Sequence, residues 1–395
     1  MLIELLLFLF LGILAGTLTG LFPGIHINLI GALLISASAS FLFFIPAIYL
    51  IVFIVSMAIT HTFLDFIPSV LLGAPEDGTE LSVLPGHDML KKGLGLQAVS
   101  LTSLGCLYGV FVFIIAAIPL FFITKNVYEV VRTATPFILI ATSLSLIIME
   151  TKKLSAFFVF FLTGAFGLSV LNLGIQEPLL PLLSGLFGAS GLLISIKSKT
   201  KIARQDVEKA IKIKKLNPIL SAALVSPLSI FLPAVSPGQV ATIGNQVVKL
   251  GREGFLFLLG IVNLLAMAFS FLALFLISKT RTGSAVAVKE LVGVLDLEIF
   301  ILIIIIILIS GVASFFITKF IAKRFVLFLE KVEYSKVSLA VLAIIFVVVF
   351  LVSGLAGIAV FIIASLTGIY CILLGVKRTH MMGCLLLPTI IIYLF

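Results

Sequence analysis

Long apolar segments recur along this chain, and they constrain its fold more than any other feature of the sequence. Residues 94–123 and 299–318, for example, contain no charged side chain, and a helix needs about 20 apolar residues to cross a bilayer. A soluble domain is about 45–50% apolar and about 25% charged, whereas this chain is 62% hydrophobic and 11% charged. We therefore expect an all-α, polytopic protein of the plasma membrane.

The number and kind of spans follow from the spacing of the apolar segments. We expect about 12 transmembrane helices, together with broken or re-entrant helices where proline, glycine and polar residues interrupt an apolar segment. The sequence lacks the short strands of alternating polarity that a transmembrane β-barrel requires. The predicted fold is therefore helical throughout.

One strongly basic segment divides the chain into two apolar parts. Residues 197–216 contain eight lysines and arginines against two acids and contribute most of the formal net charge of +9. Positively charged loops between spans stay on the cytoplasmic side, so we interpret this segment as a cytoplasmic loop and not as a nucleic-acid-binding surface. The predicted organisation is a first transmembrane repeat over residues 1–196, the basic cytoplasmic loop over 197–216 and a second transmembrane repeat over 217–395.

Two Pro-Gly pairs, one in each part, interrupt apolar segments. Proline and glycine break helical hydrogen bonding, and a helix that begins after such a break points free N–H groups and its positive dipole end forward. Two such helix ends at one cavity would suit a carboxylate or a phosphate. The substrate-binding residues predicted at the two breaks are Pro23, Gly24, His26, Asn28, Ser236, Pro237, Gly238, Gln239, Thr242 and Asn245. Simple kinks or interhelical turns are the alternative interpretation of both pairs, as a structural hydrogen bond is for His26.

The two breaks also suggest an internal duplication. Gly24 aligns with Gly238 at an offset of 214 (238 − 24), and residues 188–199 align with residues 368–379 at an offset of 180 (368 − 188). Transporters are commonly built from two inverted repeats with broken helices at equivalent positions, so we expect inverted repeats here. Chance similarity between apolar segments is the alternative.

Residues 60–92 form the most polar region that is flanked by apolar segments. Acidic residues inside a membrane are costly and are commonly functional. We predict that Asp65 and Asp77 couple transport to an ion gradient, and that Gly78 and Thr79 bind substrate. For Asp65 the alternative is a water-exposed acid at a helix end.

Chemistry other than transport finds little support in the sequence. The three cysteines lack metal-binding spacing, and the HExxH, GxSxG and P-loop motifs are absent. We therefore expect no enzyme activity, no ATP-driven pumping by this chain and no cofactor other than Na⁺ or H⁺ as the coupling ion. Arg378 and His380, near the C-terminal end of the sequence, are interpreted as residues at the cytoplasmic edge of a helix.

The segment over residues 72–109 resembles the TctA family, the large permease subunits of tripartite tricarboxylate transporters. The residues that match the family pattern there are Pro75, Gly78, Gly86, His87, Lys92, Gly93 and Gly105, and those in the earlier stretch are Gly16, Gly20, Pro23 and Gly24. The chain is shorter than typical members and is similar to an archaeal, stand-alone branch. The resemblance implies a permease for tricarboxylates, and it leaves open whether partner subunits are needed.

Together these observations favour a secondary active transporter of small organic anions such as di- and tricarboxylates. The cargo would be held at the two Pro-Gly breaks and moved by alternating access coupled to H⁺ or Na⁺. The paired Pro-Gly motifs are also similar to those of polyprenyl-phosphate translocases, so a lipid-carrier flippase is the alternative. The expected partners are the anion or lipid phosphate and membrane lipids, and a homodimer is left open.

Overall fold

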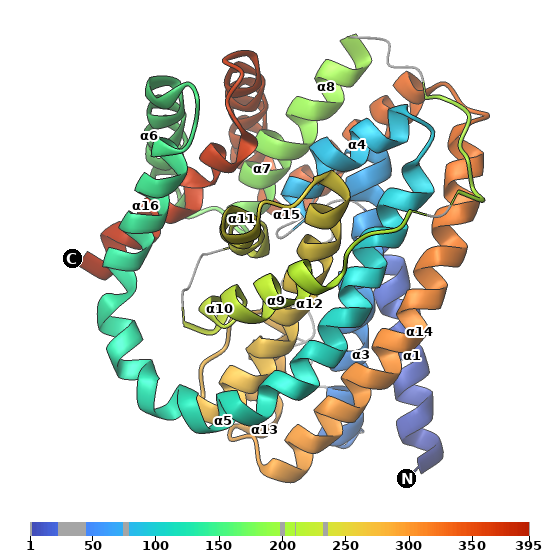
Figure 1. The fold of residues 1–395 in the computed structure, drawn as a ribbon, viewed down its shortest axis with the longest axis vertical. Coiled ribbons are helices and arrows are strands. Elements are labelled where there is room, and N and C mark those ends of the chain that lie inside the picture. The colour runs from blue at the N-terminus through green and yellow to red at the C-terminus, as the bar shows by residue number, and fades with distance from the viewer. Residues whose placement is uncertain are drawn as a thin grey trace.

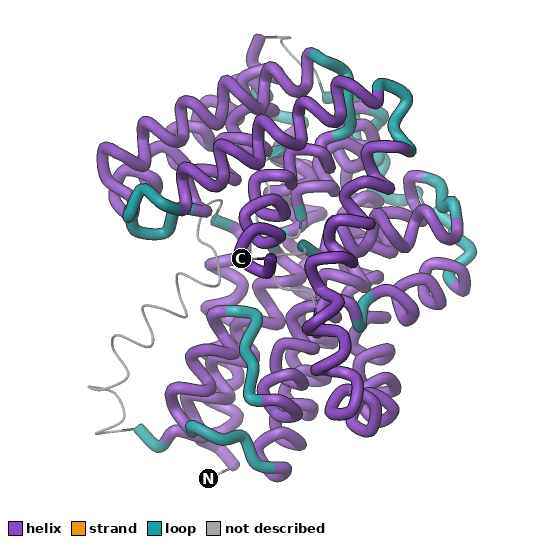
Figure 2. Tube along the Cα trace, turned by 90° about the vertical axis from the view of Figure 1, so that its left-hand side faces the viewer, coloured by secondary structure: helices purple, strands orange, loops and turns teal. Residues whose placement is uncertain are grey.

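The computed structural model describes residues 2–22, 45–73, 79–197, 202–209, 211–231 and 236–394. Within these ranges the protein is helical and contains no strand, as Figures 1 and 2 show. Eight helical segments in the described ranges are long and apolar enough to cross a membrane, and three shorter apolar helices accompany them. The expected all-α, multi-pass membrane protein is confirmed, and the expected count of 12 spans is an approximation to this pattern.

The helices divide at the basic segment. Before it lie α1 (Leu2–Leu21), α3 (Ala47–Leu64), α4 (Val83–Lys91), α5 (Gly95–Ile148), α6 (Lys153–Leu171), α7 (Leu179–Leu183) and α8 (Ser190–Lys197). After it lie α9 (Leu216–Val225), α10 (Leu228–Phe231), α11 (Pro237–Val248), α12 (Arg252–Ile277), α13 (Gly283–Val292), α14 (Leu297–Leu329), α15 (Tyr334–Leu373) and α16 (Gly383–Leu394).

Two helices, α5 and α13, differ from the sequence pattern, and a third, α15, is divided by a glycine where its apolar segments end. Residues 125–132 contain three charged residues and are compatible with a polar connection, but α5 continues through them, with Pro119 and Pro136 inside the helix. Figure 1 shows that this helix follows a wide arc, as expected for a helix interrupted by proline. Conversely, α15 is two helices joined at Gly354, whose φ of 64° and ψ of −161° are not helical. Helix α13 forms within residues 280–296, a segment with Arg281, Lys289 and Glu290 that is equally compatible with a polar connection.

Glycines allow the central helices to approach closely. Gly12, Gly16 and Gly20 follow one another at every fourth residue of α1, and a Cβ at any of them would overlap α3. Gly105 of α5 and Gly260 of α12 face each other in the same way, since a Cβ on either would overlap backbone of the other helix. Small residues at this spacing are typical of helices that associate inside a bilayer by close packing.

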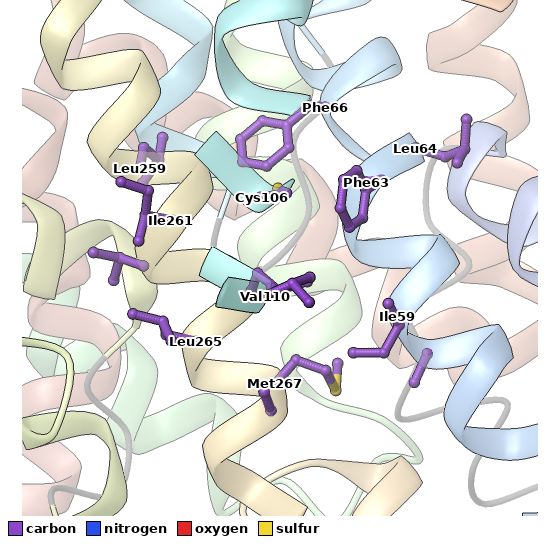
Figure 3. Packing of buried hydrophobic residues seen from close by; sticks show 14 of the residues in the cluster. Ile59, Phe63, Leu64, Phe66, Cys106, Val110, Leu259, Ile261, Leu265 and Met267 are labelled. Atoms are coloured by element: carbon purple, nitrogen blue, oxygen red, sulfur yellow. The ribbon is translucent and has the colours of Figure 1, made fainter. Parts of the chain in front are cut away.

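The buried side chains form a large bundle and a smaller one. The main bundle takes its core from α1, α3, α12, α14 and the first part of α5, and Figure 3 shows Phe63, Cys106 and Leu259 from three of these helices among its buried side chains. The peripheral bundle consists of α6, α7, α16 and the part of α15 that follows Gly354. Both sides of the basic segment thus contribute helices to each bundle.

Candidate functional site

A cavity of about 260 Å³ lies where the two bundles meet. Its walls come from α11, the start of α12, the C-terminal end of α5, the residues around Pro85 and the short helical turn Arg378–Met382 that precedes α16. Thr242, Asn245 and Gln246 of α11 line it, and so do Lys377, Arg378 and His380. Small uncharged polar groups and a basic turn therefore share an otherwise apolar pocket.

Helix α11 begins at the second Pro-Gly pair, where the sequence places a break. Ser236 is the N-cap and Pro237 the first helical residue. The Ser236 hydroxyl oxygen accepts from the Gln239 amide at 3.3 Å, and Gln239 Oε1 accepts from the Ser236 amide at 3.2 Å. This reciprocal capping box fixes the start of the helix, so residues 236–239 serve the helix end, while Thr242 and Asn245 are the predicted residues that reach the cavity.

The basic turn contributes three consecutive side chains with unused hydrogen-bonding capacity. Arg378 is only 8% exposed, and its Nη1 donates to the carbonyl oxygen of Phe187 at 3.2 Å. Arg378 Nε, Thr379 Oγ1 and His380 Nδ1 are buried and have no hydrogen-bond partner. Burial lowers the pKa of Arg378 to about 10, so the guanidinium remains charged at neutral pH, yet no carboxylate of the described residues pairs with it.

A buried acid stabilises the neighbouring residues of this turn. Glu150, at the end of α5, has its Oε2 3.2 Å from His380 Nε2 and 3.6 Å from Lys377 Nζ. Burial raises the pKa of Glu150, but the hydrogen bond with His380, the Thr151 amide and the charge of Lys377 outweigh it and hold that pKa below its ordinary value. Burial and, to a smaller extent, the charge of Lys377 lower the pKa of His380 more than Glu150 raises it, so its imidazole is neutral at pH 7.

The structure adds burial to the interpretation of Arg378 and His380, which lie in the helical turn that directly precedes α16. Both are buried, at 8% and 2% exposure, and both line the cavity. In the sequence they follow Lys377 directly and are typical of charges that mark the end of a span. Only the packing of this turn against Gly191 of α8 and against Glu150 reveals that it is internal.

Asp65 is also internal, and this excludes the alternative of a water-exposed helix end. The residue is 4% exposed and follows the last residue of α3. Asn263 Nδ2 of α12 donates to Asp65 Oδ2 at 3.4 Å. Ser69 Oγ donates to the Asp65 carbonyl oxygen at 2.7 Å and lies 2.6 Å from Thr79 Oγ1. Thr79, predicted to bind substrate, is therefore linked to the predicted coupling residue through Ser69, which the sequence did not single out.

Helix α3 carries a series of buried polar side chains that leads to Asp65. Thr60 accepts a hydrogen bond from Ser314 of α14 at 2.9 Å, and His61 Nδ1 lies 3.1 Å from the Thr19 hydroxyl of α1. With Asn263 of α12, three different helices thus contact the polar groups of α3. Buried polar groups that are hydrogen-bonded across helices fix the relative positions of those helices.

The remaining predicted residues are not described by the structure. Pro23, Gly24, His26, Asn28, Asp77 and Gly78 lie outside the described residues, so the first Pro-Gly break stays a prediction. In the part of the chain that is described, no group of three or more His, Cys, Asp or Glu side chains is placed to hold a metal ion.

Comparison with known proteins places this arrangement in a family. The family model of the tripartite tricarboxylate transporter TctA family matches residues 6–383. An uncharacterized protein of Methanocaldococcus jannaschii is 33% identical over 403 residues, covering 98% of this chain and 99% of that protein. No solved structure matches the chain. Because the match extends over nearly the whole sequence, the chain belongs to the tripartite tricarboxylate transporter TctA family.

Proposed function

We propose that the chain is a secondary active permease for small organic anions such as di- and tricarboxylates. It would reside in the plasma membrane with residues 197–216 in the cytoplasm, and it would couple transport to H⁺ or Na⁺. Membership of a tricarboxylate transporter family supports an anionic cargo and partner subunits. The cavity between the two bundles is the observation that carries the proposal.

The chemistry of the cavity favours an anion. A buried positive charge that lacks a carboxylate partner is costly, and within the described part of the chain Arg378 is such a charge. A small anion in the cavity would offset that cost, while Thr242 and Asn245 of the cavity lining would supply hydrogen bonds. Ligand sites of this type combine an apolar lining with a few placed polar groups.

The position of the cavity suits alternating access. Helix α11 and the start of α12 belong to the main bundle, whereas Met381 and Met382, directly after the basic turn, pack in the peripheral bundle. Rocking of one bundle against the other would open the cavity to either side of the membrane in turn, as in transporters whose site lies between two repeats. Asp65, buried in the main bundle, would bind the coupling ion.

The size of the cavity separates the two candidate cargoes. A volume of about 260 Å³ lies just below the range of about 300–1,000 Å³ that is typical of sites for drug-sized ligands. A short di- or tricarboxylic acid is smaller than such ligands, whereas a polyprenyl phosphate is much larger. The cavity therefore favours the organic acid over the lipid carrier.

Thermal unfolding of the purified protein tests the proposal without partner subunits. A ligand at 100 times its dissociation constant stabilises the folded state by about 2.7 kcal/mol. We expect succinate or citrate to raise the melting temperature and a polyprenyl phosphate to leave it unchanged. Stabilisation by the lipid phosphate alone would favour the flippase, and stabilisation by neither would remove the proposal.

Two variants place the bound anion in the cavity. Thr242→Val and Asn245→Leu each remove a polar group from the lining, and each should weaken carboxylate binding about 3- to 10-fold, the value of one hydrogen bond. Thr367→Val is the matched control, because Thr367 Oγ1 donates to the carbonyl oxygen four residues earlier, just as Thr242 Oγ1 does. Equal carboxylate affinities in all three variants would mean that the anion binds outside this cavity.

A further inference from the structure

Among the residues that the structure describes, the charged groups around the cavity leave one positive charge uncompensated. Lys377 and Arg378 are cationic, Glu150 is anionic, and His380 is neutral at pH 7. Among the other described elements, α11 and α16 contain no charged residue, and at the start of α12 Arg252 pairs with Asp88 at 3.2 Å while Glu253 does not line the cavity. Lys152 is tied to the Leu374 carbonyl oxygen at 2.9 Å, and His87 of α4, near enough for Arg378 to lower its pKa, is itself held neutral by burial.

His380 is placed to change this balance by one charge. Its Nε2 lies against the Glu150 carboxylate, which can only accept, so Nε2 carries the hydrogen of the neutral ring. The other nitrogen, Nδ1, is then an acceptor, and it is buried without a partner. A proton added there would convert Nδ1 into a donor and would raise the uncompensated charge of the cavity from one to two.

We propose that the cavity binds a small dicarboxylate together with one proton, with one carboxylate of the anion on Arg378 and the other on Nδ1 of protonated His380. This inference rests on the proposed function, and it names H⁺ as an ion that enters with the cargo. The single negative charge of a monocarboxylate is balanced by Arg378 alone, so its binding needs no proton. A dicarboxylate brings a second negative charge, which stays unbalanced unless His380 takes up a proton from solution. The bound anion itself promotes this uptake, because a nearby negative charge favours the charged imidazole.

The two unpartnered nitrogens give the proposal its geometry. Arg378 Nε and His380 Nδ1 belong to residues that flank Thr379 in one short helical turn, and all three residues line the same cavity. Thr379 Oγ1, also unpartnered, would contribute a hydroxyl between the two carboxylates. Nothing else within the described protein uses these three atoms.

Titration calorimetry in two buffers that differ in ionisation enthalpy measures the protons taken up on binding. Succinate serves as the dicarboxylate probe, and butyrate, with the same number of carbons, as the monocarboxylate. At pH 7 to 7.5 we expect succinate to bind with uptake of about one proton and butyrate with none. His380→Gln keeps a hydrogen bond to Glu150 but cannot be protonated, so succinate should bind it more weakly and without proton uptake.

Two further variants separate charge from protonation. Glu150→Gln leaves two uncompensated cations, so succinate should bind without proton uptake. Arg378→Gln should weaken both anions about 10- to 100-fold, as expected for a lost charge-assisted hydrogen bond, while Arg324→Gln, an exposed arginine on α14, is the matched control. Melting temperatures of the unliganded variants show whether each is folded.

The outcomes distinguish this inference from the proposed function. Succinate binding without proton uptake in the unmodified protein, undiminished uptake in His380→Gln, or equal affinities of Arg378→Gln and Arg324→Gln would each overturn the inference and leave the permease proposal standing. If no carboxylate binds the unmodified protein, both are overturned.

Discussion

At the scale of single residues, Asp65 is the side chain on which ion coupling should depend. An acid that is 4% exposed between α3 and α12 is retained at a cost in stability, since a polar residue in a membrane interior must be hydrated, paired or hydrogen-bonded. Such a residue can accept a proton or bind a cation when the protein changes conformation. Its position one helix away from α11 would let it respond to the state of the cavity.

The substitution Asp65→Asn tests this role. The amide keeps the shape of the side chain and a hydrogen bond to Asn263 but cannot hold a proton or bind a cation as tightly. We expect gradient-driven uptake in reconstituted vesicles to fall by at least tenfold, a loss of about 1.4 kcal/mol of driving interaction, while carboxylate binding in detergent is retained.

Asp88→Asn is the control for that experiment. Asp88 lies on α4, is 51% exposed and pairs with Arg252 at 3.2 Å, and exposed pairs contribute only about 0–1 kcal/mol. Gradient-driven carboxylate uptake by Asp88→Asn should therefore stay near that of the unmodified protein. Unchanged gradient-driven uptake in Asp65→Asn would remove Asp65 from the mechanism.

The residues that sequence reasoning found and those it missed differ in their local context. Asp65 stands out because an acid interrupts an apolar segment, and the start of α11 because Pro-Gly marks a helix start. The sequence pattern predicts Ser236 and Gln239 as substrate-binding residues and does not indicate that they cap this helix. Arg378 gave no such signal, since it sits in a short basic group like those that end many spans. Its burial depends on α8 and Glu150, which are distant in sequence, so only tertiary structure reveals it.

At the scale of helices, close glycine contacts should determine the stability of the main bundle. A Cβ on Gly260 would overlap the carbonyl oxygen of Thr102 in α5, and overpacking of this kind typically costs about 1–3 kcal/mol. We therefore expect Gly260→Ala to lower the free energy of unfolding in detergent, measured with denaturant.

A second glycine of α12 provides the control for this substitution. At Gly254 the nearest atoms to a new Cβ belong to the flexible side chain of Leu250, at 3.3 Å and beyond. Alanine favours a helix over glycine by about 1 kcal/mol, so Gly254→Ala should be neutral or stabilising. If both variants are stabilised, α5 and α12 do not pack as closely as the structure shows.

The ends of a helix could be predicted from the sequence where contact with lipid requires an apolar surface. They could not be predicted where the helix carries polar residues. The two parts of α15 follow from their apolar segments, with Gly354 between them. The continuity of α5 through residues 125–132 did not follow, because a polar segment there is equally compatible with a loop. Helix α13, which carries Lys289 and Glu290, was missed for the same reason.

At the scale of the whole molecule, the two halves of the sequence do not form separate bodies. Helices α3 and α5 of the first half share a core with α12 and α14 of the second, and α6 packs beside α16 (Figure 1). Apolar periodicity identifies the spans but carries no information on which span contacts which. The position of the cavity between the bundles therefore had to come from the structure.

The orientation of the chain in the membrane gives the last prediction. Residues 179–197 form a segment long and apolar enough to cross the membrane, so the loop before it and the basic segment after it should lie on opposite sides. Gln176 and Lys212 are exposed in these two places. Because basic loops stay inside, a cysteine at position 212 should be cytoplasmic and one at position 176 external.

A membrane-impermeant maleimide applied to intact cells measures this difference. Gln176→Cys should react at once, and Lys212→Cys only after the membrane is opened. The unmodified protein is the background control, since Cys106, Cys371 and Cys384 are all buried. Reaction of both variants from the same side would mean that residues 179–197 do not cross the bilayer. The reverse order would place the basic segment outside, against the charge rule.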